Sequence, residues 1–289
     1  MNNRKKVVLV THTGSDMPLA EAEALGIYII PDKVIFGDKE YRNMTEITAE
    51  EFYEKLNSAA ELPTSSQPSA GDFVKTFQKA AEDADEVLCL MITSKMSGCY
   101  QTAVSAAQMV ISMGLTAPVY VYDTQQCSHG MAQMVRAAVA MAEGGLSAHE
   151  IMDELTLLQH RMGVFFVLDS LENAKKGGRV GAVTAHTVNM LGIKPLLMFS
   201  DGLVREFGIS RNFDSGINKI VNQFVKNGDR TYPVTVFHAD ASERAETLRE
   251  KILQSVPEAI IRIETVGPVI GIYTGSGCAG IAFTEKYVL

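Results

Sequence analysis

The sequence predicts an α/β protein, in which a parallel sheet with helices on both faces is joined to a second, α+β domain. Short β-branched runs alternate with helical patterns over roughly the first 160 residues, an order typical of parallel sheets. After that point Ser200-Asp201-Gly202 separates two apolar runs, which is a hairpin signature. The 289 residues, 46% of them hydrophobic, are enough for two cores. We therefore expect domains at residues 1–160 and 161–289, closely packed because no low-complexity linker separates them.

In the first domain, short runs of apolar and β-branched residues predict strands at 7–10, 28–30, 34–36, 39–42, 86–92 and 119–122. Thr48 and Glu51 form a capping box that opens a helix ending near residue 56. Ser69 is placed to cap a helix that ends near residue 81. Two further helices are expected at 99–113 and 128–143.

The second domain has a different pattern. Strands are predicted at 164–167, 193–199, 203–209, 234–238, 260–263 and 269–273, with helices between the later ones. Tyr273 is thus expected at the end of an apolar strand, just before a glycine-rich turn. Lys175-Lys176-Gly177-Gly178-Arg179 breaks the chain sharply, and its arginine is expected on an exposed turn.

Two hydroxyl-rich loops are the main functional signal. They read PTSSQPS at 63–69 and TSKMSGCY at 93–100, and each precedes a predicted helix. Helix starts offer free N–H groups and a partial positive charge, so they hold anions. Neither loop has a cluster of Lys or Arg, or an obvious catalytic base. This pattern suits a carboxylate that is bound rather than attacked.

Helix capping is the simpler alternative for both loops. It accounts for Ser69, and in the second loop for Ser94 or Ser97. It accounts less well for Thr64, Ser65 and Ser66, because one cap needs one hydroxyl.

Several function classes are disfavoured. A net charge of -8 argues against a nucleic-acid surface. Gly275 to Gly280 matches G-x-G-x-x-G, but too little chain follows for a dinucleotide site, and P-loop and G-x-S-x-G motifs are absent. Scattered Cys and His residues predict neither a metal nor a cofactor. The basic start lacks the long apolar region of a signal peptide, and no run is long enough to span a membrane, so we expect a cytoplasmic protein.

Six short motifs in order carry a resemblance to a known family. They are SQPS at 66–69, MSGCYQTA at 96–103, KGGR at 176–179, IKP at 193–195, Arg211 after the hairpin, and GPVIG at 267–271. Together they resemble the DegV family, whose members act as fatty-acid-binding proteins, over nearly the whole chain.

The resemblance implies two domains that exchange a segment, with about residues 28–60 packing on the second domain and the acyl chain in a tunnel between the two. It implies that a long-chain fatty acid is bound through its carboxylate, mainly by Ser65 and Ser97. The full set of expected ligand-binding residues is Thr13, Thr64, Ser65, Ser66, Ser97, Gly98 and Tyr273.

The resemblance also implies a partner. Members of the family present the bound acid to a separate ATP-dependent fatty acid kinase, which makes acyl phosphate for phospholipid synthesis. The chain is therefore expected to be a carrier and not an enzyme. Arg179 and Arg211 are expected to face the kinase, and a transient contact with a membrane surface is compatible with this role.

Three positions depart from the family pattern. Thr11-His12-Thr13 stands where T-D-S is frequent, Ser65 replaces a threonine, and Tyr273 replaces a histidine that contacts the carboxylate. Two other functions stay open. One is a binding protein or sensor for another apolar carboxylate without a kinase partner, and the other is a serine-dependent acyl hydrolase with Ser97 as nucleophile.

Overall fold

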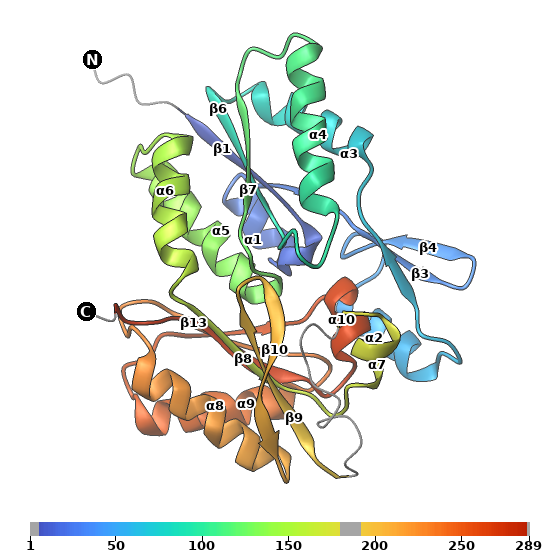
Figure 1. Cartoon of the computed structure of the whole chain (residues 1–289), viewed down its shortest axis with the longest axis vertical. Helices are drawn as coiled ribbons and strands as arrows, with labels where there is room; N and C mark the ends of the chain where they lie inside the picture. The colour runs from blue at the N-terminus through green and yellow to red at the C-terminus, as the bar shows by residue number, and fades with distance from the viewer. Residues whose placement is uncertain (1–5, 180–191, 288–289) are drawn as a thin grey trace.

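The computed structural model describes residues 6–179 and 192–287, which form three sheets surrounded by helices (Figure 1). Within these residues no helix combines the length and the apolar character needed to cross a membrane.

The first sheet is parallel and has the strand order β2-β1-β6-β7. Its strands are β1 (Val7–His12), β2 (Tyr28–Ile30), β6 (Glu86–Met91) and β7 (Val119–Asp123). Every residue of β6 is buried, as its apolar run predicted. Figure 1 shows α3 and α4 on one face and α5 and α6 on the other, which confirms the predicted layers.

The helices of this region are α1 (Leu19–Ala24), α3 (Ala70–Ala81), α4 (Cys99–Ser112), α5 (Ser128–Glu143) and α6 (Ala148–Gln159). Ser69 caps α3 as predicted, in a capping box with Asp72. Helix α6 was not predicted, although Ser147 and Glu150 form a capping box at its start.

The second large sheet is mixed and has the order β10-β9-β8-β13-β11-β12. Its strands are β8 (Met162–Val167), β9 (Lys194–Ser200), β10 (Leu203–Ser210), β11 (Val234–His238), β12 (Ile261–Thr265) and β13 (Ala279–Thr284). The predicted β9–β10 hairpin is confirmed, with Asp201 at φ 52° and Gly202 at φ 74° in its turn. Helices α8 (Phe213–Asn227) and α9 (Ser242–Ser255) pack against this sheet, and the short α7 (Glu172–Lys176) follows β8.

Two local predictions were wrong. Residues 269–273 are not a strand, because they lie in helix α10 (Pro268–Thr274), with Pro268 in its first turn. A short buried apolar run reads equally well as a strand or a helix, so periodicity alone could not decide. Residues 64–66 are not a plain loop before α3 either, since they form the edge strand β5 (Thr64–Ser66).

Strand β5 belongs to a small antiparallel sheet of order β4-β3-β5, with β3 (Lys33–Phe36) and β4 (Lys39–Arg42). This sheet and helix α2 (Ala49–Ser58) share a core with residues of the second sheet and of α10. The Tyr53 hydroxyl, for example, donates to the carbonyl of Val266 at 2.9 Å. The early segment thus packs on late parts of the chain, while the domain boundary near residue 160 stays a prediction.

Candidate functional site

A cavity of about 380 Å³ lies where the three sheets meet. It takes residues from the carboxyl ends of β1 and β6, which is where ligands bind in open α/β folds. Its volume falls within the range of roughly 300–1,000 Å³ found for small-molecule sites. Much of its wall is apolar and comes from β8, β9, β11 and α10, with the side chains of Val164, Phe166, Leu197, Phe199, Phe237 and Val269.

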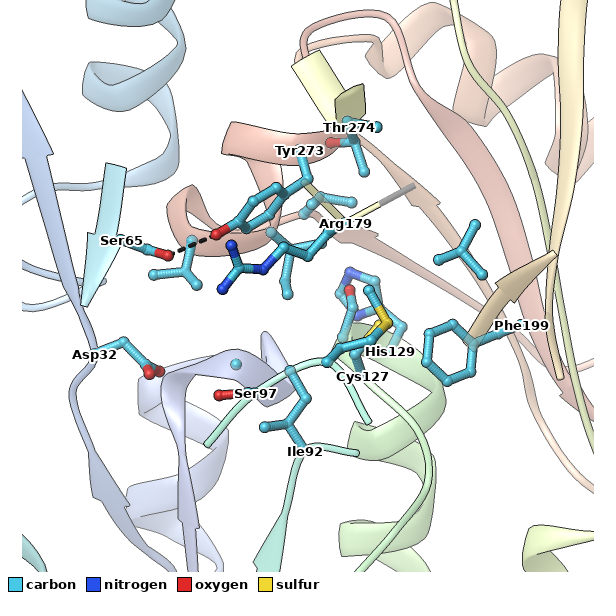
Figure 2. A pocket seen from close by; sticks show the side chains of 18 of the residues that line it. Asp32, Ser65, Ile92, Ser97, Cys127, His129, Arg179, Phe199, Tyr273 and Thr274 are labelled. Carbon is cyan, nitrogen blue, oxygen red and sulfur yellow. Dashed lines mark hydrogen bonds between the residues drawn. The ribbon is translucent and has the colours of Figure 1, made fainter. Parts of the chain in front are cut away.

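One end of this cavity is built from neutral hydroxyls, and we call it the polar end. Ser65 and Tyr273 are joined by a hydrogen bond of 2.8 Å between their hydroxyl oxygens. Ser97 lies across from them, while Phe199 lies at the opposite side of the cavity (Figure 2). Hydroxyl donors at one end and an apolar wall beyond them suit a molecule with a small polar head and a long apolar tail.

The two hydroxyl-rich loops meet at this end. The Gln67 side chain of the first loop donates to the Thr102 hydroxyl on α4 at 2.7 Å. The capping alternative named Ser94 or Ser97, but the N-cap residue of α4 is Gly98, which makes no side-chain cap. The Ser97 hydroxyl oxygen accepts from the backbone N–H of Cys99 at 3.2 Å. Its hydrogen can therefore be donated to a ligand.

The Lys176–Arg179 turn closes over Tyr273. A Cβ atom on Gly177 would lie only 2.5 Å from the Tyr273 ring, so this close approach requires glycine. The Arg179 guanidinium carbon lies 5.5 Å from the centroid of the same ring, within the range of a cation–π contact. Arg179 also lines the cavity and reaches toward the polar end (Figure 2).

A buried ion pair, which the sequence analysis did not find, borders the polar end. His12 Nδ1 lies 2.8 Å from Asp32 Oδ2, and the Thr13 hydroxyl donates to the same oxygen at 2.9 Å. Burial alone would lower the pKa of His12, but the Asp32 carboxylate and the Cys99 thiol raise it well above its ordinary value. The pair brings one charge of each sign, so it adds no net charge to this end. Twenty residues separate the two partners in sequence, and no short motif could have shown the contact.

Cys99 lies beside this pair, with its sulfur 3.9 Å from His12 Nδ1. One ligand atom from each of His12, Asp32 and Cys99 lies within 4.8 Å of the others. Within this cluster the Asp32 Oδ2 atom is already hydrogen-bonded to His12 and Thr13.

A second buried polar group, also missed from the sequence, begins at the start of α5. His129 lines the cavity and its Nδ1 lies 2.9 Å from Glu264 Oε2. The neighbouring Ser128 hydroxyl donates to Asp16 at 2.5 Å. Burial raises the pKa of Asp16 to about 6, against the opposing effects of His129 and of the Ser128 hydrogen bond.

A model of the family described as "Uncharacterised protein, DegV family" matches residues 6–286. The chain belongs to the DegV family. A DegV domain-containing protein of Halalkalibacterium halodurans is 31% identical over 97% of this chain and 99% of the relative. The resemblance drawn from the six motifs is thereby confirmed.

Solved structures of DegV proteins share the fold. One from Thermus thermophilus, described for its fatty acid binding, has a TM-score of 0.89 and 31% identity, and covers 97% of this chain and 100% of that one. A stearic acid-binding protein from Eubacterium ventriosum has a TM-score of 0.88 and 27% identity, and covers 96% and 98%.

The structure brings five of the seven predicted ligand-binding residues to the cavity, and these are Ser65, Ser66, Ser97, Gly98 and Tyr273. Thr64 is exposed on β5 and lies outside the lining. Thr13 is buried behind the lining, where it bonds Asp32. Both arginines assigned to a partner are exposed, as predicted for Arg179, but Arg179 also lines the cavity, whereas Arg211 lies outside it after β10.

Around Gly275–Gly280 the helix and the strand come in the opposite order to that of a dinucleotide fingerprint. The segment follows helix α10 and runs into strand β13, whereas the fingerprint joins a strand to a following helix. This segment therefore lacks the structural context of a dinucleotide site.

Proposed function

We propose that this DegV protein is a cytoplasmic carrier that binds one long-chain fatty acid and presents it to a separate ATP-dependent fatty acid kinase. One observation carries the binding part: a hydroxyl-lined end and an apolar wall border the same cavity. The relatives described as binding fatty acids, at 27–31% identity over nearly the whole chain, support it.

In this proposal the carboxylate lies at the polar end. Ser65 and Ser97 donate to it directly, and Tyr273 supports Ser65 through their hydrogen bond. Ser66 and the backbone of Gly98 complete the contact surface, while Thr64 and Thr13 contribute through β5 and through Asp32.

The apolar wall supplies most of the affinity. Burial of a sixteen-carbon chain releases about 0.8 kcal/mol per methylene group, or roughly 12 kcal/mol before the cost of ordering the ligand. Immobilisation removes several kcal/mol of this total. A head group held by neutral hydroxyls is then sufficient, and it leaves the carboxylate oxygens reactive toward a phosphoryl donor.

The geometry disfavours the acyl hydrolase. A serine nucleophile needs an adjacent base. Among the described residues, the one hydrogen bond of the Ser97 hydroxyl is to the Cys99 backbone, and Ser65 bonds Tyr273, so neither serine is hydrogen-bonded to a histidine. We therefore propose that catalysis belongs to the kinase.

Arg179 and Arg211 remain our candidates for contact with the kinase. Arg211 is exposed and lies outside the cavity lining, which suits a role in docking alone. Arg179 lies at the cavity and over Tyr273, so it is placed to contact both the partner and the loaded head group. Arg211→Ala should spare fatty-acid binding and reduce acyl-phosphate formation with a cognate kinase.

Lipid identification tests the carrier function most directly. Gently purified protein is denatured, and the released lipids are identified by mass spectrometry. We expect a long-chain fatty acid at close to one equivalent. If the protein releases no lipid and also fails to bind acids of fourteen to eighteen carbons by calorimetry, the carrier function is wrong.

A further inference from the structure

His129 places a polar atom in the cavity wall beyond the polar end. Its side chain is fully buried, with 0% of its surface exposed. Nδ1 contacts Glu264, whereas Nε2 has no hydrogen-bond partner in the described part of the chain. A buried polar atom without a partner is costly, so its position at a ligand cavity calls for a ligand group.

A network of charges fixes the orientation of this imidazole. Glu264 Oε1 accepts from Arg136 at 2.5 Å, and Arg136 also binds both carboxylate oxygens of Glu21, at 2.8 and 2.6 Å. Burial would raise the pKa of Glu264, but His129 and Arg136 lower it overall, so the carboxylate is ionised. An ionised carboxylate only accepts, so Nδ1 carries the hydrogen in this contact and Nε2 is the nitrogen left without a partner.

The surroundings of His129 in the wall are apolar. Its ring stacks on Phe237 with 5.3 Å between centroids, and Phe237 in turn contacts Phe166. In Figure 2, His129 lies between the polar end, marked by Ser65 and Ser97, and the apolar side, marked by Phe199. In the proposed binding mode this part of the wall faces the acyl chain and not the carboxylate.

We propose that His129 recognises a hydroxyl group on the acyl chain, so that the preferred ligands are hydroxylated long-chain fatty acids. This inference rests on the proposed function and specifies its substrate class. An unsubstituted chain would cover Nε2 with methylene groups and leave it unpaired. A site built to bond a ligand hydroxyl discriminates against the analogue that lacks it.

A hydroxyl fits Nε2 better than other oxygen groups do. A neutral imidazole presents a lone pair at Nε2, and a protonated one presents an N–H. A hydroxyl donates to the first and accepts from the second, whereas a ketone or an ether can only accept. Because Glu264 and Arg136 hold the ring in place, the contact should select one narrow range of positions along the chain.

A competition experiment tests the proposal. The wild-type protein is incubated with an equimolar mixture of stearic acid and monohydroxystearic acids that differ in the carbon bearing the hydroxyl. The bound acids are then quantified by mass spectrometry. We expect one isomer, or two adjacent ones, to exceed stearic acid by about fivefold or more, in line with one net hydrogen bond.

His129→Phe is the decisive variant, because it keeps an aromatic ring against Phe237 and removes Nε2 while Arg136 still pairs with Glu264. It should lose the preference for the hydroxylated isomer and bind stearic acid at least as tightly as the wild type. His149→Phe is the matched control, since His149 is exposed and lies outside the cavity lining, and it should keep the wild-type ratio.

Three results would overturn the inference: no isomer is preferred by the wild type, the preference survives in His129→Phe, or His129→Phe loses stearic acid as well. The last result would indicate that His129 binds the carboxylate of the fatty acid. If His129→Phe does not fold, the competition experiment with the wild-type protein alone tests the inference. Failure of the wild type to bind any acid in the mixture would instead count against the proposed carrier function.

Discussion

Two polar regions border the same cavity and are built in opposite ways. The polar end presents the hydroxyls of Ser65, Ser97 and Tyr273, which are partly exposed and come from an edge strand, a loop and a short helix. The inner region holds Asp16, Ser128 and His129, all of them buried, with the ionised Glu264 behind them.

The difference separates two tasks. Neutral hydroxyls can bind a carboxylate and also release it, because no buried charge is left uncompensated when the ligand leaves. A buried network of charges is fixed when the chain folds, and its energy depends on pH and on every partner. We therefore expect changes at the polar end to alter ligand affinity, and changes in the inner region to alter stability or ligand choice.

Blocking the apolar wall should lower fatty-acid affinity more than any other change, because the wall adjoins both polar regions. Val204 on β10 lines the cavity beside Phe199, its partner across the hairpin. If Val204→Trp displaces six methylene groups, the loss is about 5 kcal/mol, or roughly three-thousandfold in affinity for an eighteen-carbon acid. Calorimetric titration with acids of increasing length measures this loss.

The control for this variant lies on the same strand. Ile209 is 39% exposed and outside the cavity lining, so Ile209→Trp should bind all the acids as the wild type does. Equal affinity of Val204→Trp for long and short acids would show that the acyl chain does not lie along this wall.

Removal of the two serine hydroxyls should cause the next largest loss of fatty-acid affinity. Each hydrogen bond to a charged acceptor contributes about 1.5–3 kcal/mol. Because backbone N–H groups at the start of α4 remain, we expect Ser65→Ala with Ser97→Ala to cost about 3–4 kcal/mol of binding free energy. The melting temperature should stay close to that of the wild type.

Ser105→Ala is a suitable control, since its hydroxyl only donates to a carbonyl within α4. Unchanged affinity in the double variant would show that the carboxylate does not bind at the polar end. Hydrolysis of acyl esters by the wild type that is lost in Ser97→Ala would favour the enzyme instead.

Asp16 should dominate the pH dependence of the inner region. Its pKa is about 6 in the fold, against an ordinary value of 3.8, so the folded state holds the proton more tightly. The free energy of unfolding attributable to Asp16 therefore falls as pH rises from about 4 to 6 and stays low above that range. Asp16→Asn should gain roughly 2.5 kcal/mol relative to wild type between pH 4 and pH 8.

Chemical denaturation at the two pH values checks this gain. Asn also tolerates the left-handed backbone of residue 16, whose φ is 54°, so the substitution adds no backbone strain. The exposed Asp38→Asn is the control and should show no such trend. A stability difference for Asp16→Asn that does not vary with pH would contradict the assigned shift.

The sequence predicted the fold better than it predicted the site. Buried runs such as 86–92 and capping boxes such as that at Thr48 are local signals, and they located their elements. Strand β13 was missed because its Ala and Gly residues have low β-propensity, although it lies in the middle of the second sheet.

The polar end was predicted because its hydroxyls cluster in two loops. The inner region was not, because its contacts join residues far apart in the chain. His129 and Glu264 are separated by 135 residues, and Asp16 and Ser128 by 112. Such pairs leave no spacing to recognise in a single sequence, and only the packing of α5 against both sheets brings them together.

Of these variants, Tyr273→Phe should change fatty-acid affinity least. It tests whether the Tyr273 hydroxyl takes part in the polar end. The Tyr273 hydroxyl bonds the neutral Ser65 hydroxyl, so its removal should cost about 1 kcal/mol of binding free energy, roughly fivefold. Because the polar end binds the head group through hydroxyl groups, wild-type affinity should vary little between pH 5 and pH 8.

Two further variants complete this test. Tyr273→His should bind with a pH dependence that the wild type lacks, because a histidine can gain charge near neutral pH. Tyr232→Phe, at an exposed tyrosine outside the cavity lining, should change nothing. If Tyr273→Phe binds fatty acid as tightly as the wild type from pH 5 to pH 8, then Tyr273 only packs against Gly177 and Arg179, and the two hydroxyl loops alone hold the head group.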